Sequence, residues 1–499
     1  MADHRFQNAP RRRSAGLIAA ALMFALGAVG CSNGGGQATN NSGNGGGQAT
    51  NNNANGGGGQ GTNNGGGQIA GTNLTSPLEP AYITWVHNGV NEPLRGFWQT
   101  VADEFMADHP GVNVTVQPVQ NETLRNTVLP TAFHVEQGND SAPDLFQSWG
   151  GGELRDWANQ GVAWDITQVL APTIANVSDP VKAGWAIDAE QYGLPYTYGP
   201  AGFWVNLNAL NDAGLVQDAQ LDASGNVESG TVDWPTDISG LFHMWASLSD
   251  HNITPVAVGG GDNWPAAWWW YAAATKTCSP DALSAAGDLH DFSDPCWVQA
   301  GDALQEIMDH DAFNSDWQTT GAQVGADSAA GRVASGAAAM ELTGPWGGRA
   351  MADAVGDNAE IPGYLAWYPF PPISGRPGVE NIMAGGDGFS VLNPTLGSQA
   401  RSDAAAALLA YIMSDSVQAR FAETVQLAPT NTVAGANLSN SILANQYQAI
   451  SQATYVVPWF DVLFGTQIAT PMNQAINELM AGQGAPQGLV DTLGAAAGN

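Results

Sequence analysis

The pattern of hydrophobic and polar residues switches between alternating and helical spacing several times after residue 80. Residues 82–86 and 112–116 alternate apolar and polar positions, which predicts two strands. Between them, the apolar residues of 94–105 recur every three or four positions, which predicts a helix. Residues 143–149 predict a third strand. This β-α-β-α-β order predicts an α/β fold with a parallel sheet covered by helices.

Polar residues follow the ends of these predicted strands. Ligands of open α/β sheets bind beyond the carboxyl ends of the strands. Here those ends are His87-Asn88-Gly89 and Trp149-Gly150. Asn88 and Glu92 are therefore candidates for ligand binding, although helix capping would explain both residues equally well.

The first thirty residues have the layout of a secretion signal. Arg11–Arg13 form a basic segment, and residues 14–30 form an apolar run that is short for a membrane span. The run ends in Ala28-Val29-Gly30-Cys31, which is similar to the lipobox of bacterial lipoproteins. We predict a signal peptide at 1–30 and lipidation of Cys31, which would anchor an exported protein at the cell envelope. An ordinary signal peptide followed by an incidental cysteine is the alternative.

Residues 31–77 consist mainly of Gly, Asn, Gln and Thr. A nine-residue unit, Asn-Gly-Gly-Gly-Gln-Ala-Thr-Asn-Asn, begins at Asn33 and again at Asn44. Core-forming residues are almost absent, so this segment is predicted to be a flexible tether. Random-coil scaling gives it a root-mean-square reach of roughly 35–40 Å.

Charge excludes several classes of partner. The chain has 14 Lys and Arg against 46 Asp and Glu, a formal net charge of −32. Such a chain repels phosphate backbones and anionic lipids, which excludes nucleic-acid binding and a basic membrane-surface patch. The two lysines, Lys182 and Lys276, do not lie in a phosphate-binding loop motif.

After Cys31, the sequence contains two cysteines, Cys278 and Cys296. An even pair in an exported chain predicts one disulfide bond. Two unrelated buried thiols are the alternative. A zinc site is not expected, because the two cysteines lack a matched pair of histidines.

Six segments, in a fixed order over about four hundred residues, carry a family resemblance. They are residues 83–105, Pro143-Asp-Leu-Phe through Trp149-Gly150, Tyr192-Gly-Leu-Pro-Tyr196 with Phe203-Trp-Val-Asn206, Ala338-Ala-Met through Gly344-Pro-Trp346, Ala384-Gly-Gly-Asp-Gly388, and Leu427-Ala-Pro-Thr430. From about residue 81 to 497 the chain resembles extracellular solute-binding proteins of family 1. These are carbohydrate-binding lipoproteins that serve ABC transporters.

The resemblance implies a two-lobed, periplasmic-binding-protein-like (type II) fold with a ligand cleft between the lobes. Each lobe would be a mainly parallel sheet flanked by helices. We expect lobe 1 at 78–195 and 346–390, and lobe 2 at 196–345 and 391–499. Hinge segments are expected near 194–204, 342–346 and 389–393. The expected protein is a monomer without a cofactor, whose partners are a sugar and the membrane permease of an ABC transporter.

Tryptophan is unusually abundant, with 18 residues. Sugars offer apolar C–H faces and a rim of hydroxyl groups, so flat aromatic rings suit them. Candidates near expected loop ends are Trp149, Trp204, Trp264 and Trp346, and the resemblance favours Trp264 and Trp346 for stacking. Core packing is the alternative for each. Core positions are predicted for Trp85, Trp98, Trp367 and at least one or two residues of Trp268–Tyr271, which cannot all face one side of a helix.

Two further polar candidates lie in the segments that resemble the family. Asp387 is surrounded by glycines that allow the backbone to approach a ligand closely, and a turn aspartate is its alternative. Tyr196 would hydrogen-bond the ligand or line the hinge.

After residue 77, where the folded part is expected, the sequence has no G-x-S-x-G nucleophile elbow and no H-E-x-x-H or C-x-x-C motif. A glycosidase needs only two suitably spaced carboxylates, which a sequence cannot reveal, so a secreted carbohydrate-active enzyme remains an alternative. A receptor for peptides or for a cationic solute is the other alternative, and the negative charge favours it.

Overall fold

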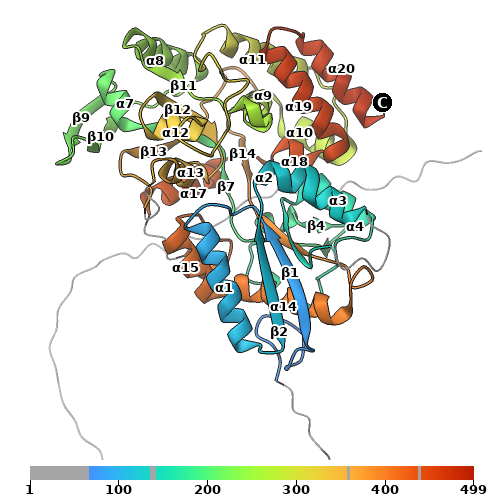
Figure 1. Cartoon of the computed structure of the whole chain (residues 1–499). Helices are drawn as coiled ribbons and strands as arrows, with labels where there is room; N and C mark the ends of the chain where they lie inside the picture. Colours follow the sequence, from blue (N-terminus) through green and yellow to red (C-terminus); the bar gives the residue numbers. More distant parts are fainter. Residues whose placement is uncertain (1–66, 135–141, 357–359, 437–439, 499) are drawn as a thin grey trace, which may run out of the picture.

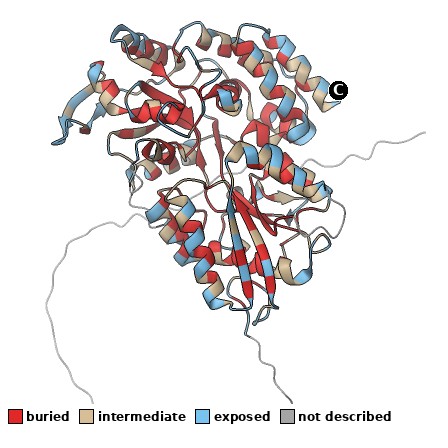
Figure 2. Ribbon diagram, in the orientation of Figure 1, coloured by how far each residue is buried: buried red, intermediate tan, exposed pale blue. Residues whose placement is uncertain are grey.

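The computed structural model describes residues 67–134, 142–356, 360–436 and 440–498. The chain forms two lobes, each built around a β-sheet with helices on both faces (Figure 1). Buried residues follow the strands and the inner faces of the helices (Figure 2). The predicted signal peptide, Cys31 and most of the tether lie outside the described residues. The tether is shorter than predicted, because residues 67–77 pack on the first lobe, where Ile69 is buried.

The first lobe contains a five-stranded sheet in the order β2-β1-β3-β15-β6. Its strands are β1 (Ala81–His87), β2 (Val112–Pro118), β3 (Leu145–Ser148), β6 (Leu194–Pro195) and β15 (Gly388–Val391). Strands β2, β1 and β3 run parallel, as the sequence predicts. Strand β15 is antiparallel to both of its neighbours, because it enters this sheet from the other lobe.

Helices cover both faces of this sheet. One face carries α1 (Leu94–Asp108), α14 (Gln399–Ile412) and α15 (Asp415–Val425), and Trp98 stacks on Phe421 there with ring centroids 5.6 Å apart. The other face buries Trp157 of α4 (Gly151–Asn159). Shorter elements of this lobe are α2 (Asn121–Thr123), η1 (Leu124–Val128), α3 (Leu129–Phe133), α5 (Ala171–Ile174), α6 (Asp179–Ala183), β4 (Ala186–Ile187), β5 (Glu190–Gln191) and α16 (Thr432–Gly435).

The second lobe contains a four-stranded sheet in the order β11-β12-β8-β13. Its strands are β8 (Gly202–Asn206), β11 (Thr254–Val256), β12 (Ala338–Thr343) and β13 (Leu365–Pro369). This sheet is mixed rather than mainly parallel, which corrects the expectation. Strand β8 arrives from the first lobe and is antiparallel to β12 and β13.

The helices of the second lobe form its largest core. They include α9 (Trp264–Thr277), α11 (Cys296–Met308), α19 (Thr466–Met480) and α20 (Pro486–Ala497). On the opposite face, α12 (Ala329–Ala334) and α13 (Gly347–Ala354) form a smaller cluster. The remaining elements are α7 (Leu207–Asp212), β9 (Val216–Leu221), β10 (Val227–Val232), α8 (Ile238–Asp250), η2 (Gly260–Asp262), α10 (Pro280–Leu289), α17 (Ser441–Gln452) and α18 (Phe460–Leu463).

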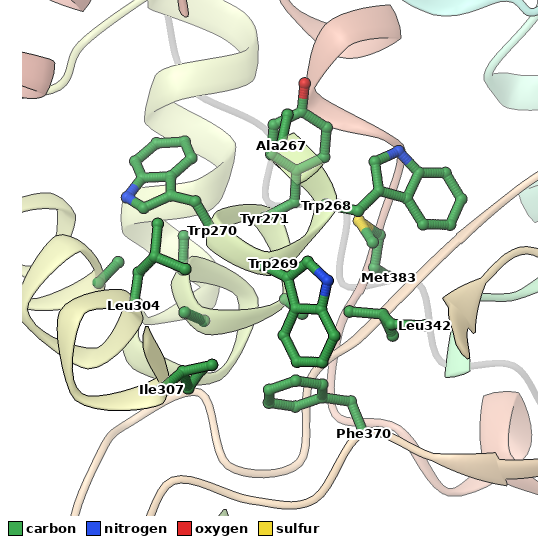
Figure 3. Close-up of a cluster of buried hydrophobic side chains, with 14 of the residues drawn as sticks. Ala267, Trp268, Trp269, Trp270, Tyr271, Leu304, Ile307, Leu342, Phe370 and Met383 are labelled. Carbon is green, nitrogen blue, oxygen red and sulfur yellow. The ribbon is translucent and has the colours of Figure 1, made fainter. Parts of the chain in front are cut away.

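Helix α9 carries the tryptophan run, and its side chains point to different sides of the helix (Figure 3). Trp269 packs near Phe203, and Trp270 packs near Trp297 of α11. Both are buried, which confirms the prediction that part of the run belongs to the core.

The disulfide prediction is also confirmed. Cys278, directly after α9, bonds to Cys296 at the start of α11, with their Cα atoms 5.1 Å apart.

Strands that cross between the lobes form the connection. The chain crosses from β6 through β7 (Gly199–Pro200) to β8, and returns from β14 (Ile382–Gly385) to β15. Strand β14 also pairs with β7 and with β16 (Val456–Val457). A third crossing follows α16, since α16 packs against α15 in the first lobe and α17 packs against β13 in the second.

These crossings move the predicted lobe boundaries. Helix α13 and strand β13, expected in lobe 1, belong to lobe 2, because β13 pairs with β8. Helices α14 and α15 were expected in lobe 2, because the boundary was placed after residue 390. They belong to lobe 1, where they pack beside strand β15. The expected hinge at 342–346 is not a crossing. That segment joins β12 to α13 within the second lobe.

Gly386 lies where two crossing segments touch. A Cβ atom at this position would lie 1.8 Å from the backbone oxygen of Thr197. We expect Gly386→Ala to lower the free energy of unfolding by about 3 kcal/mol, since backbone must move to relieve the overlap. Urea denaturation measures the effect. Gly363→Ala is the control, because its Cβ would meet nothing within 4 Å. Equal stability of the two variants would contradict the tight crossing.

Candidate functional site

A cleft of about 400 Å³ lies between the two lobes. The first lobe contributes residues 88–91 and 120–122, and the second contributes 321–324, 459 and 461–462. Six of the eight residues predicted from the sequence line this one cavity. They are Asn88, Trp149, Tyr196, Trp264, Trp346 and Asp387. Their part in ligand binding stays a prediction.

Four tryptophans form one side of the cleft, here called the tryptophan wall. It consists of Trp264, Trp268, Trp346 and Trp459. Trp264 and Trp346 meet edge to face at 6.0 Å between ring centroids, and Trp268 stacks on Trp459 at 4.6 Å. Trp268 and Trp459 are almost fully buried, whereas Trp264 and Trp346 are half-buried. The latter two therefore present the more accessible rings.

Local backbone features hold this wall in place. Asn263, at a positive φ of 64°, turns the chain into α9 and sets Trp264 at its first position. Trp346 caps α13. Trp459 lies against Gly385, where a Cβ would approach its ring to 2.4 Å. The wall thus depends on a glycine in the crossing strand.

Asp387 faces the cleft from the crossing between β14 and β15. Its carboxylate accepts hydrogen bonds from Gln147 Nε2 at 3.1 Å and from Asn88 Nδ2 at 3.5 Å. Burial raises the pKa of Asp387 to about 6, although hydrogen bonds from Asn88, Trp149 and Gln147 oppose the rise. Near pH 7 the group is mainly ionised, so it is an acceptor aimed at the cavity.

Arg125 connects the two lobes at the edge of the cleft. Its guanidinium pairs with Glu153 of the first lobe, with nitrogen and oxygen 2.8 Å apart, and with Asp461 of the second lobe. It also lies over the Trp149 ring, 5.4 Å from the centroid. Burial opposes the charge, but the two carboxylates raise the pKa of Arg125 overall. No sequence pattern indicated Arg125 and Asp461, because 336 residues separate them in the chain.

Two predicted site residues do not line the cleft. Trp204 is only 1% exposed, and its ring packs on Gly347 and Gly348 while its Nε1 donates to Gly344 O at 2.8 Å. It belongs to the core of the second lobe. Glu92 accepts a hydrogen bond from Gly96 N at 2.8 Å and pairs with Arg95. The capping alternative therefore describes Glu92.

Tyr196 lines the cleft from a largely buried position. Tyr196 is 1% exposed and its ring stacks on Phe389, with centroids 4.9 Å apart.

The predicted core assignments of Trp85, Trp98 and Trp367 are confirmed, since none is more than 3% exposed.

The described residues contain no group of three or more His, Cys, Asp or Glu side chains arranged to hold a metal ion. Within the same ranges, no helix is long and apolar enough to cross a membrane.

A sequence model of bacterial extracellular solute-binding proteins matches residues 91–419. The chain belongs to this family. No curated protein sequence matches this solute-binding protein significantly. Its family is one of binding proteins rather than enzymes.

Solved structures show the same two-lobed fold. A chitin oligosaccharide binding protein superposes with a TM-score of 0.71 at 19% identity, covering 84% of this chain and 98% of its own. A protein from work on xylan utilization by Caldanaerobius polysaccharolyticus gives 0.69 at 19% identity, with coverages of 83% and 99%. The GacH receptor of Streptomyces glaucescens, solved with and without acarbose, gives 0.62 at 20% identity, with coverages of 83% and 97%.

Proposed function

We propose that this solute-binding protein captures a sugar of two or more units between its lobes for an ABC transporter. The single observation that carries the proposal is one cleft that is lined by both the tryptophan wall and Asp387. Aromatic faces suit the C–H faces of a sugar ring, and the carboxylate and amides suit its hydroxyl groups. The sugars named for the structural neighbours, chitin oligosaccharide and acarbose, support the same ligand class.

Capture and release follow from the position of the cleft. A ligand that contacts both lobes favours the closed arrangement only as far as it binds that arrangement more tightly. The closing motion would occur at the crossings near Thr197 and Gly386. The closed form would then dock on the permease. Lipidation of Cys31 and the tether would keep the receptor at the membrane, exposed outside the cytoplasm.

A thermal-shift screen of the purified protein tests this function. A ligand that binds only the native state stabilises it by about 2.7 kcal/mol at a free concentration of 100 Kd. This stabilisation raises the melting temperature. We expect a saturable increase with one class of oligosaccharide and none with peptides or polyamines.

Two other outcomes would contradict the proposal. An increase in melting temperature with peptides or polyamines alone would show that the ligand is another solute and not a sugar. Release of shorter sugars during incubation, followed by chromatography, would identify an enzyme instead.

A further inference from the structure

A second cavity adjoins the cleft. This chamber has a volume of about 560 Å³ and lies between α2 and η1 of the first lobe and α19 of the second. It shares five lining residues with the cleft, which are Glu122, Arg125, Asp262, Trp264 and Asp461. The two spaces are therefore contiguous, and Trp264 borders both. Each volume lies within the range of about 300–1,000 Å³ that holds one small ligand.

Helix α19 supplies one side of the chamber from a single helical face. Thr466, Thr470, Asn473 and Asn477 are spaced by three or four residues and line the chamber. The opposite face of α19 buries residues such as Met472 in the core of the second lobe. The polar face is thus held rigidly toward the chamber.

The chemistry of the chamber differs from that of the cleft. Seven of its lining residues are Asn or Gln, including Asn126, Gln318, Gln474 and Gln483. An amide offers both donors and an acceptor, as a sugar hydroxyl does. Among the described residues that border the chamber, Trp264 is the one aromatic residue. The chamber therefore suits hydroxyl groups more than sugar-ring stacking.

Charged groups at the junction oppose anions. Burial raises the pKa of Glu122, and the nearby carboxylates of Asp262 and Asp461 raise it further, although Asn121 and Arg125 lower it. Among the five described residues shared by the two spaces, the guanidinium is that of Arg125, which is already paired with Glu153 and Asp461. An acidic sugar would meet uncompensated negative charge here.

We infer that the chamber is a second carbohydrate compartment, which holds the part of an uncharged oligosaccharide that extends past Trp264 from the cleft. The inference rests on the proposed function and names its ligand more closely. A ligand that fills both spaces is longer than one that fills the cleft alone. The protein therefore selects its ligand by chain length and by the absence of acidic groups.

Titration calorimetry with one homologous series of neutral oligosaccharides, from one unit to six, tests the inference. Affinity is expected to rise with the number of sugar units until the cleft is filled. It should rise a second time when the added units enter the chamber. Thr470→Trp fills the chamber from an exposed position and should remove that second rise, about tenfold in affinity or 1.4 kcal/mol. Asn477→Ala should reduce it. Gln467→Trp is the matched control, because Gln467 is exposed on α19 but does not line the chamber.

The outcomes separate this inference from the proposed function. Equal affinity for short and long sugars, or the same affinities in Thr470→Trp as in the wild type, would overturn the role of the chamber in sugar binding. Either result would leave the proposed binding of sugar in the cleft intact. Tighter binding of a uronic-acid oligosaccharide than of its neutral counterpart would also overturn it. Failure of every sugar to bind the wild-type protein would overturn both. Melting curves of each variant show whether the fold is kept.

Discussion

Replacing Arg125 by methionine should lower the free energy of unfolding by about 3–5 kcal/mol near pH 8. The guanidinium side chain is 16% exposed, and its partners Glu153 and Asp461 are 2% and 6% exposed. Removing one member of a buried charged cluster leaves the others without compensation. Asp461 Oδ1 already lacks a hydrogen-bond partner within the described residues. Two buried carboxylates would then remain at the junction of the lobes.

The loss should shrink as the pH falls. Burial raises the pKa of Glu153 even with Arg125 present, and without the arginine the rise becomes larger. A carboxyl group whose folded pKa exceeds its unfolded pKa destabilises the protein at high pH. The penalty disappears as the pH approaches the unfolded value of about 4.3. The difference between variant and wild type should therefore be smaller at pH 5 than at pH 8.

Urea denaturation at both pH values measures this effect. Arg420→Met is the matched control, because Arg420 also forms an ion pair, with Glu104, but is 41% exposed. Exposed pairs contribute about 0–1 kcal/mol. Equal losses in the two variants, or a loss in Arg125→Met that is independent of pH, would show that the cluster does not hold the lobes as described.

Replacing Trp346 by alanine should weaken sugar binding by about 30-fold or more, corresponding to about 2 kcal/mol. Trp346 is half-buried and contacts the three other rings of the tryptophan wall. It also packs against the main cores of both lobes. Removing it takes away an accessible ring at the position where a sugar would span the lobes. Trp346→Phe should show a smaller loss, because a shorter aromatic face remains.

Titration calorimetry with the sugar found in the thermal-shift screen measures this change. Trp234→Ala is the matched control. Trp234 is also half-buried in the second lobe and stacks on Tyr368 at 4.4 Å, but it does not line the cleft. A folded Trp346→Ala variant that binds sugar like the wild type would remove the wall from the ligand site.

Local signals in the sequence predicted much of this fold. The alternating pattern located β1 and β2, and the helical spacing located α1, because these elements bury one regular face. The even pair of cysteines, Cys278 and Cys296, in a chain expected to be exported indicated the disulfide. The lobe boundaries were harder to predict, because β13 and β15 join their sheets only after the chain has crossed between lobes. A strand that serves one lobe looks the same in sequence as a strand that serves the other.

For the candidate site too, residues marked by local sequence features were predicted correctly, whereas residues placed by contacts between distant segments were not. Trp264 and Asp387 follow glycine-containing turns, which mark them as irregular positions that can face a cleft. Trp204 lies within a strand, and its indole is covered by two glycines of α13 that come more than 140 residues later. Trp459 could not be recognised, since its place beside Gly385 is a contact between distant segments. The cluster around Arg125 is similarly a product of the folded chain alone.

We propose above that one sugar contacts both lobes in the cleft. A crystal structure of the protein with the oligosaccharide selected by the thermal-shift screen tests this contact most directly. We expect sugar rings against Trp264 and Trp346, with hydroxyl groups within hydrogen-bond distance of Asp387 and Asn88. Sugar bound outside the interlobe cleft, or in contact with only one lobe, would contradict it.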